Sequence, residues 1–159
     1  HEIAADAFYV NAPKLPDAIL ASLKRAPLVI SQLPLREGEV RAADIMVGSK
    51  ADLPDIPIAD VWGKARRLAS NRLTHLVMTD GPAAISVYDG NTETRVTLGR
   101  CVTVRDTIGA GDTFSGSLLH TVLGGKNVVE ASQLAGDATT AWLERRESQT
   151  RSATEKSIS

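Results

Sequence analysis

The stretch Asp106-Thr107-Ile108-Gly109-Ala110-Gly111-Asp112-Thr113-Phe114 carries more structural information than any other in this chain. Two glycines flank Ala110 and permit backbone angles that other residues resist, so consecutive N–H groups can turn towards one anion. A helix is predicted from Ala110 to Leu123, because apolar residues recur on one helical face and Gly124-Gly125 follows as a stop. A glycine turn that leads into a helix N-terminus gathers unpaired donors and the positive end of the helix dipole. The stretch therefore predicts a phosphate site.

Asp112 has two interpretations on the sequence alone. A carboxylate beside an anion site would be repelled by bound phosphate, which favours a catalytic base that faces a second substrate. The alternative is a tight loop before an ordinary helix, in which Asp112 is a first-turn acid favoured by the helix dipole. The residues around it leave both interpretations open.

The whole stretch resembles the motif D-T-x-G-A-G-D-x-F of the ribokinase-like (PfkB-type) carbohydrate kinases, and every fixed position is matched. The resemblance implies a ribokinase-like three-layer α/β sandwich, with a mostly parallel sheet and helices on both faces. It also implies ATP-dependent phosphorylation of a sugar hydroxyl. Asp112 would then be the base, and the N–H groups of Gly109, Ala110 and Gly111 would form the anion hole.

The same resemblance implies two kinds of metal ion. Mg²⁺ would accompany ATP and shield its phosphate oxygens. The carboxylate of Asp106 and the carbonyl of Ile108 would bind a monovalent cation such as K⁺. Family members usually have a glycine near Glu147 that closes a cation-binding and nucleotide loop, and this chain has none there.

Ser49 and Asp52 follow a predicted strand at the spacing of the family's N-x-x-E motif, which helps to place magnesium and the nucleotide phosphates. Ser lacks the amide of Asn, and Asp reaches less far than Glu, although it can still bind metal through water. A similar V-S-K-D string is found in ketohexokinase-like members. The alternative is a strand-to-helix turn with a solvated charge pair.

Three further residues are nominated for the nucleotide by resemblance. The family's T-x-G loop between two strands lies beside the nucleotide, which indicates Thr79 and Gly81. The alternative there is a simple turn, because Asp80-Gly81 is a common turn pair. Gly136 falls where family members pack against adenine.

The apolar patterns predict strands that alternate with helices, and therefore an α/β sheet that is largely parallel. Residues 1–146 are predicted to be the C-terminal part of a ribokinase-like kinase domain, and residues 147–159 a disordered tail because they are rich in Ser, Thr and charge. Residues 1–11 are too short a pattern to decide. Strands are predicted at 28–31, 43–47, 73–79, 85–88, 94–98 and 101–104, and helices at 15–25, 58–70, 110–123 and 127–146.

Composition narrows the classes of partner. The chain has 159 residues, 43% of them hydrophobic and 23% charged, which suits one globular domain with a substantial core. A net charge of −1 offers no general attraction to nucleic acid or to an anionic membrane. Cys101 is the one cysteine, so no internal disulfide can form and no zinc cluster can be spelled out. A cytoplasmic location is the default expectation.

The resemblance also implies that the chain lacks part of a kinase. Family members are longer, and they place their sugar-contacting strands and lid in an N-terminal half that this chain does not contain. A homodimer is one arrangement that the family would suggest. The expected function is sugar phosphorylation; the alternative is a truncated or degenerate member that serves as a non-catalytic nucleotide-binding or assembly module.

Overall fold

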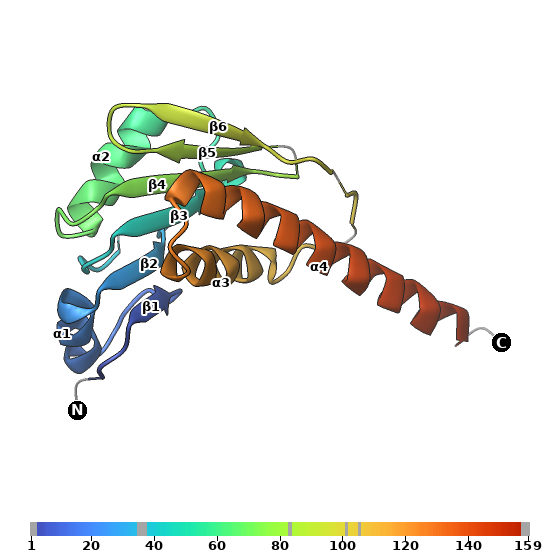
Figure 1. The fold of residues 1–159 in the computed structure, drawn as a ribbon, viewed down its shortest axis with the longest axis horizontal. Helices are drawn as coiled ribbons and strands as arrows, with labels where there is room; N and C mark the ends of the chain where they lie inside the picture. The colour runs from blue at the N-terminus through green and yellow to red at the C-terminus, as the bar shows by residue number, and fades with distance from the viewer. Residues whose placement is uncertain (1–2, 35–37, 83, 101, 105, 157–159) are drawn as a thin grey trace.

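A six-stranded sheet forms the centre of the computed structural model, which describes residues 3–34, 38–82, 84–100, 102–104 and 106–156. The strands follow one another across the sheet in chain order. The first four strands pair in parallel, and the last two pair antiparallel with their neighbours. They are β1 (Ala7–Val10), β2 (Leu28–Gln32), β3 (Ile45–Ser49), β4 (His75–Asp80), β5 (Ala84–Tyr88) and β6 (Glu93–Thr97) (Figure 1).

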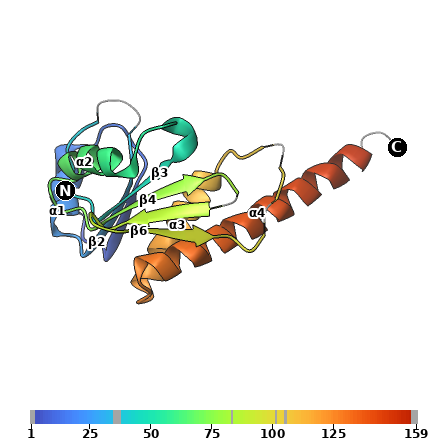
Figure 2. The same ribbon diagram turned by 90° about the horizontal axis from the view of Figure 1, so that it is seen from above.

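Helices cover both faces of the sheet, so the molecule has three layers (Figure 2). Helices α1 (Asp17–Arg25) and α2 (Ile58–Leu68) pack on one face, and α3 (Ala110–Leu123) and α4 (Val128–Lys156) pack on the other. A short 3₁₀ turn, η1 (Lys50–Asp52), follows β3. The predicted α/β architecture, with a largely parallel sheet and helices on both faces, is confirmed.

The core consists of two apolar clusters separated by the sheet. Neighbouring residues of β2 enter opposite clusters, because successive side chains of a strand point to opposite faces. Val29 therefore packs with Leu23 of α1, and Ile30 packs with Phe114 of α3. Strands buried on both faces are apolar almost throughout, which is why short continuous apolar runs predict them correctly.

The chain between β6 and α3 differs from the prediction. Residues 102–104 form no strand, and Cys101 lies outside the described residues. Because β6 runs antiparallel to β5, it ends at the same edge of the sheet as β1 to β4. Residues 102–104 and 106–107 form no further strand before α3.

Helix α4 is longer than predicted. It begins after Asn127, whose Oδ1 accepts the N–H of Glu130 at 2.9 Å and so caps the helix. It then continues through Glu147 to Lys156 and extends beyond the sheet (Figure 1), where the composition predicts a disordered tail. No Gly or Pro in this part of the chain would stop a helix. In the part of the chain described, no helix is both long and apolar enough to cross a membrane.

Arg72 and Asp44 tie together the edge of the sheet at which β2, β3 and β4 begin. Arg72 Nε donates to Asp44 Oδ1 at 2.7 Å, and Asp44 Oδ2 accepts the N–H of Val29 at 2.7 Å. Arg72 also donates to the carbonyls of Leu23 and Ala26 at 3.0 and 2.6 Å. These are carbonyls at the end of α1 that the helix itself leaves without donors.

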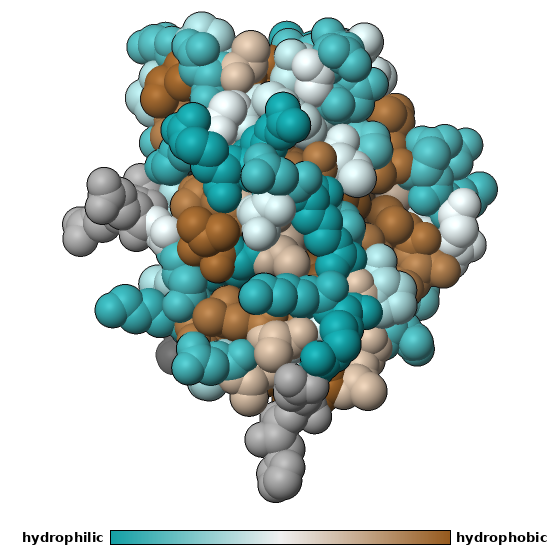
Figure 3. Space-filling model, turned by 90° about the vertical axis from the view of Figure 1, so that its left-hand side faces the viewer, coloured by the Kyte–Doolittle hydropathy of each residue, from teal (hydrophilic) through white to brown (hydrophobic). Residues whose placement is uncertain are grey.

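The surface is mixed on the side seen in Figure 3. Hydrophobic residues there form separate areas among hydrophilic ones. Scattered apolar residues of this kind are ordinary on a protein surface.

Candidate active site

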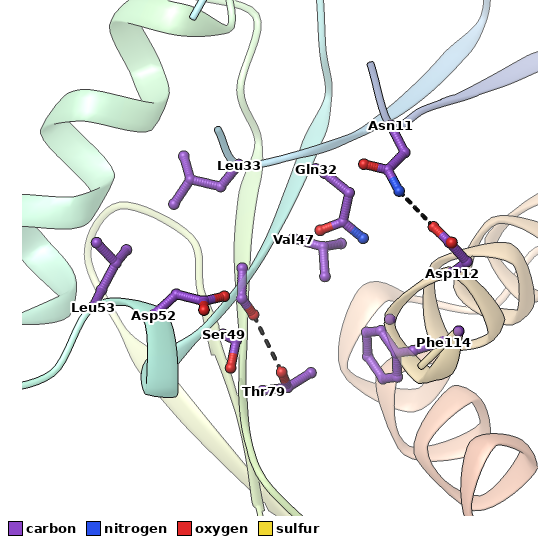
Figure 4. A pocket seen from close by; sticks show the side chains of 13 residues that line it. Asn11, Gln32, Leu33, Val47, Ser49, Asp52, Leu53, Thr79, Asp112 and Phe114 are labelled. Atoms are coloured by element: carbon purple, nitrogen blue, oxygen red, sulfur yellow. Dashed lines mark hydrogen bonds between the residues drawn. The ribbon is translucent and has the colours of Figure 1, made fainter. Parts of the chain in front are cut away.

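A cavity of about 340 Å³ lies where β1 to β4 end and α3 begins. Open α/β sheets bind ligands at the carboxyl ends of their strands, so this is the expected place for a site. Side chains from the strand ends on one side and from α3 on the other line it (Figure 4). The lining residues are Asn11, Gln32, Leu33, Val47, Gly48, Ser49, Asp52, Leu53, Thr79, Gly109, Gly111, Asp112 and Phe114.

Gly109 makes the turn that starts α3. Its backbone is left-handed, with φ 87° and ψ −5°, a conformation that glycine adopts without strain. The N–H of Ala110 donates to the carbonyl of Thr107 at 3.0 Å, so one of the three predicted anion-hole donors is engaged. Within the described residues, no acceptor is recorded for the N–H groups of Gly109, Gly111 and Asp112. These donors lie at the positive end of the α3 dipole.

Asp112 is held from the N-terminal part of the chain. The hydroxyl of Tyr9 donates to Asp112 Oδ1 at 2.6 Å. Asn11 Nδ2 donates to the same oxygen at 2.7 Å, a contact drawn in Figure 4. No partner for Asp112 Oδ2 is recorded among the residues that the structure describes. One oxygen of the Asp112 carboxylate is thus held by two donors.

A second layer of hydrogen bonds supports this arrangement. Gln32 Nε2 donates to the Tyr9 hydroxyl at 3.0 Å and to Ser115 Oγ of α3 at 2.9 Å. Burial, followed by the hydrogen bond to the Asp112 carboxylate, raises the pKa of Tyr9 above its usual value. Tyr9 therefore keeps its proton at neutral pH and stays a donor to Asp112.

Three of the residues nominated for nucleotide and metal share this cavity: Ser49, Asp52 and Thr79. Ser49 Oγ accepts the N–H of Ala51 at 3.3 Å as the cap of η1. Thr79 Oγ1 donates to the carbonyl of Gly48 at 3.3 Å. Asp52 and Asp112 lie at opposite sides of the cavity (Figure 4). Among the described residues, no group of three or more His, Cys, Asp or Glu side chains gathers to hold a metal.

The two other nominated glycines do not line the cavity. Gly81 has φ 57° and makes the turn between β4 and β5. Gly136 is a buried residue of α4, where a Cβ would come within 2.4 Å of Leu98 Cδ2 and 3.0 Å of Ile85 Cδ1. Its evident role is to let α4 approach the sheet closely.

The two residues nominated for a monovalent cation meet an arginine instead. Arg146 Nη2 lies 2.6 Å from Asp106 Oδ2, and Nη1 donates to the carbonyl of Ile108. Asp106 Oδ1 also accepts the N–H of Ile108 at 2.8 Å. Helix α4 thereby holds the loop that leads into Gly109.

The family of this chain follows from comparison with models of known protein families. The model of the pfkB family carbohydrate kinases matches residues 38–156, about three quarters of the chain. The chain belongs to the pfkB family. The ribokinase-like resemblance of the Asp106–Phe114 stretch is thus confirmed, while the ketohexokinase-like subtype stays a prediction. Sequence comparison with curated proteins gives no match.

Solved structures show the same fold. Ribokinase from Thermotoga maritima is 18% identical, with a TM-score of 0.68 over 85% of this chain and 49% of that one. Ribokinase from Arabidopsis thaliana, solved with ribose and ATP, is 19% identical, with a TM-score of 0.60 over 81% and 47%. A pyrophosphate-dependent kinase of the ribokinase family, solved with sulfate, is 16% identical, with a TM-score of 0.62 over 89% and 58%. This pfkB-family chain spans about half the length of these relatives.

Sequence reasoning missed Tyr9, Asn11 and Gln32. Residues 1–11 form too short a pattern to assign, and no motif marks Gln32 at the end of its strand. One signal is present in the sequence, because Asn11 directly follows an apolar run and Gln32 follows another after one serine. In a parallel sheet such positions meet at the ligand-binding edge. Their closeness to Asp112, however, depends on how β1 and β2 pair.

Gly109→Ala should lower the free energy of unfolding by about 1–2 kcal/mol, because alanine is strained in the left-handed region. Its Cβ would also come within 3.3 Å of Trp142 Cη2. Gly116→Ala is the matched control within α3, since nothing lies within 4 Å of a Cβ there. That substitution should stabilise by about 0.5–1 kcal/mol. Urea unfolding measures both, and equal effects would contradict the role given to Gly109.

Proposed function

We propose that this chain carries the phosphoryl-transfer site of an ATP-dependent sugar kinase, with Asp112 as the base. The observation that carries the proposal is the position of Asp112. Its carboxylate stands in the cavity beside the start of α3, with Oδ1 fixed by Tyr9 and Asn11 and no recorded partner of Oδ2 among the described residues. A bare first-turn acid would need none of these contacts.

The donor side of the site is the turn at Gly109. The N–H groups of Gly109 and Gly111 and the dipole of α3 would stabilise the charge that develops on the transferring phosphoryl group. In the present geometry Ala110 N–H would contribute only after leaving the carbonyl of Thr107. Ser49, Thr79 and Gly81, which lie at or just after the ends of β3 and β4, would contact the remainder of the nucleotide. Gly136 packs against Leu98 and Ile85 and is not assigned to the nucleotide.

Magnesium, when bound with ATP, supplies neutralisation of the phosphate charge. The residue that would hold it is Asp52, which lines the cavity on the side away from Asp112 (Figure 4). A carboxylate acting through bound water suits this cation. The separation of the two carboxylates would leave Asp112 to the acceptor.

The proposed reaction passes a proton from the acceptor to Asp112 and a phosphoryl group from ATP to the acceptor. An acceptor hydroxyl would donate to Oδ2, and its oxygen would bond to the γ-phosphorus as the bond to the β,γ-bridging oxygen breaks. ADP leaves, and the hydroxyl proton passes to Asp112. The fixed Oδ1 keeps the carboxylate in one orientation during the transfer, which is a positioning contribution.

The choice of substrates rests on the family. The relatives include proteins solved with ribose and ATP and with myo-inositol and a pyrophosphate analogue. A small polyhydroxylated acceptor is therefore the class expected here. ATP is the proposed donor, and pyrophosphate is the alternative that a test has to separate from it.

A turnover assay on the full chain tests the proposal. Acceptors would be ketoses, aldoses, inositols and nucleosides, each offered with ATP and, in parallel, with pyrophosphate. Release of ADP that depends on one acceptor supports the kinase. Turnover with pyrophosphate alone would contradict ATP as the donor. Nucleotide binding without turnover for any acceptor would favour the alternative of a non-catalytic module.

Tyr9→Phe should lower kcat about 5- to 10-fold, because it removes one of the two donors that orient Asp112. A hydrogen bond to a partly exposed charged group contributes about 1 kcal/mol or slightly more, which corresponds to this change in rate. Tyr88→Phe is the matched control, since the Tyr88 hydroxyl donates to the carbonyl of Gly90 on the other side of the sheet. Steady-state kinetics should show less than about a 2-fold change there. Similar losses in both variants would contradict the positioning role.

A further inference from the structure

The loop before α3 carries two oxygen atoms that the family resemblance assigns to a monovalent cation, and both are already occupied. Asp106 Oδ2 and the carbonyl oxygen of Ile108 each accept a hydrogen bond from the guanidinium of Arg146. A guanidinium has the same single positive charge as K⁺, and its planar fork suits two neighbouring acceptors. The two ligands therefore do not fit an additional cation.

Arg146 is held in place by its own helix. Its guanidinium carbon lies 5.3 Å from the centre of the Trp142 ring, one turn earlier in α4, at cation–π distance. The same Trp142 ring packs over Gly109, since its Cη2 would lie 3.3 Å from a Cβ at that position. Trp142 and Arg146 thus contact successive parts of one loop.

The sequence provides this arrangement by continuing α4. No glycine or proline interrupts residues 137–156, and the helix runs through Arg146 to Lys156. Where relatives are expected to close a cation-binding loop, this chain presents a helical face. The positive charge beside Asp106 and Ile108 is then that of the Arg146 side chain.

We infer that the guanidinium of Arg146 takes the place of the monovalent cation at Asp106 and Ile108. Arg146 is then a positioning residue, which fixes the loop that delivers Gly109 and the start of α3. K⁺ bound to these two oxygens would lie beside the guanidinium of Arg146, and two neighbouring positive charges repel each other. K⁺ could therefore bind there only by displacing Arg146. The loop should therefore keep its structure without K⁺. Arg146 would hold it whatever reaction the cavity carries out, so the test below needs no turnover.

The experiment compares the unfolding temperature of the full chain in KCl and in choline chloride at equal ionic strength. The wild type should unfold at the same temperature in both salts. In choline chloride, Arg146→Ala should unfold about 2–6 °C below the wild type. In KCl the variant should recover part of this loss, because the oxygens of Asp106 and Ile108 become free to bind K⁺. Thallium(I) NMR, with Tl⁺ as the probe for K⁺, should show binding to this variant and none to the wild type.

Two further variants complete the design. Arg145→Ala removes an exposed arginine one position earlier in α4 that makes none of these contacts, and it should behave as the wild type does. Arg146→Lys keeps the positive charge, so its unfolding temperature should stay the same in KCl and in choline chloride. This variant replaces Arg146→Ala in the comparison if Arg146→Ala fails to fold. Dependence of the wild type on K⁺, or Tl⁺ binding to it, would overturn the inference. So would a folded Arg146→Ala that neither binds Tl⁺ nor responds to K⁺.

Discussion

Asp112→Asn should reduce acceptor phosphorylation about 100- to 10,000-fold and leave ATP binding nearly unchanged. The amide has the size of the carboxylate, and its oxygen can still accept hydrogen bonds from Tyr9 and Asn11. It cannot take up the proton of the acceptor hydroxyl. Steady-state kinetics would give kcat, and titration calorimetry with ATP would give the affinity for the donor.

Asp60→Asn is the control for this variant. Asp60 is the third residue of α2, as Asp112 is the third residue of α3, so both acids have the same place relative to a helix dipole. Removing either charge should cost at most about 1 kcal/mol of stability. Only Asp112→Asn should affect turnover. If both variants leave turnover intact, Asp112 is a first-turn acid and the proposed base is wrong.

Arg72→Met should lower the free energy of unfolding by about 2–3 kcal/mol and the unfolding temperature by about 5–10 °C. The substitution removes the partner of Asp44 and leaves the carbonyls of Leu23 and Ala26 without this donor. A fully buried pair would cost more when broken, but these two side chains are 25% and 17% exposed. Thermal and urea unfolding would measure the loss.

Two comparisons make the Arg72 result interpretable. Arg66→Met on α2 removes an exposed arginine and should change stability by less than about 0.5 kcal/mol. The double variant Arg72→Met with Asp44→Asn should recover part of the loss, because no unpaired charge then remains and the amide oxygen can still accept the N–H of Val29. Since Arg72 lies at the edge of the sheet opposite the cavity, turnover at low temperature should be retained. A loss no greater than that of Arg66→Met would contradict the structural role.

The sequence by itself determined the local elements and the family. The predicted helix at 110–123 has the bounds of α3, and the apolar runs at 28–31 and 85–88 lie within β2 and β5. These features depend on residues close together in the chain. Their apolar periodicity and the positions of glycine predict helices and strands without any knowledge of distant contacts. The motif from Asp106 to Phe114 identified the family for the same reason, because its parts are contiguous.

The tertiary structure alone decided what surrounds that motif. Tyr9 and Asn11 reach Asp112 across 103 and 101 positions, and Arg146 reaches Asp106 across 40. No local pattern encodes these contacts, because they follow from the order of strands in the sheet and from the length of α4. Helix α4 brings the guanidinium of Arg146 to two oxygens that the family resemblance assigns to K⁺. A motif specifies which groups are present, whereas the packing of distant elements decides which of those groups are already occupied.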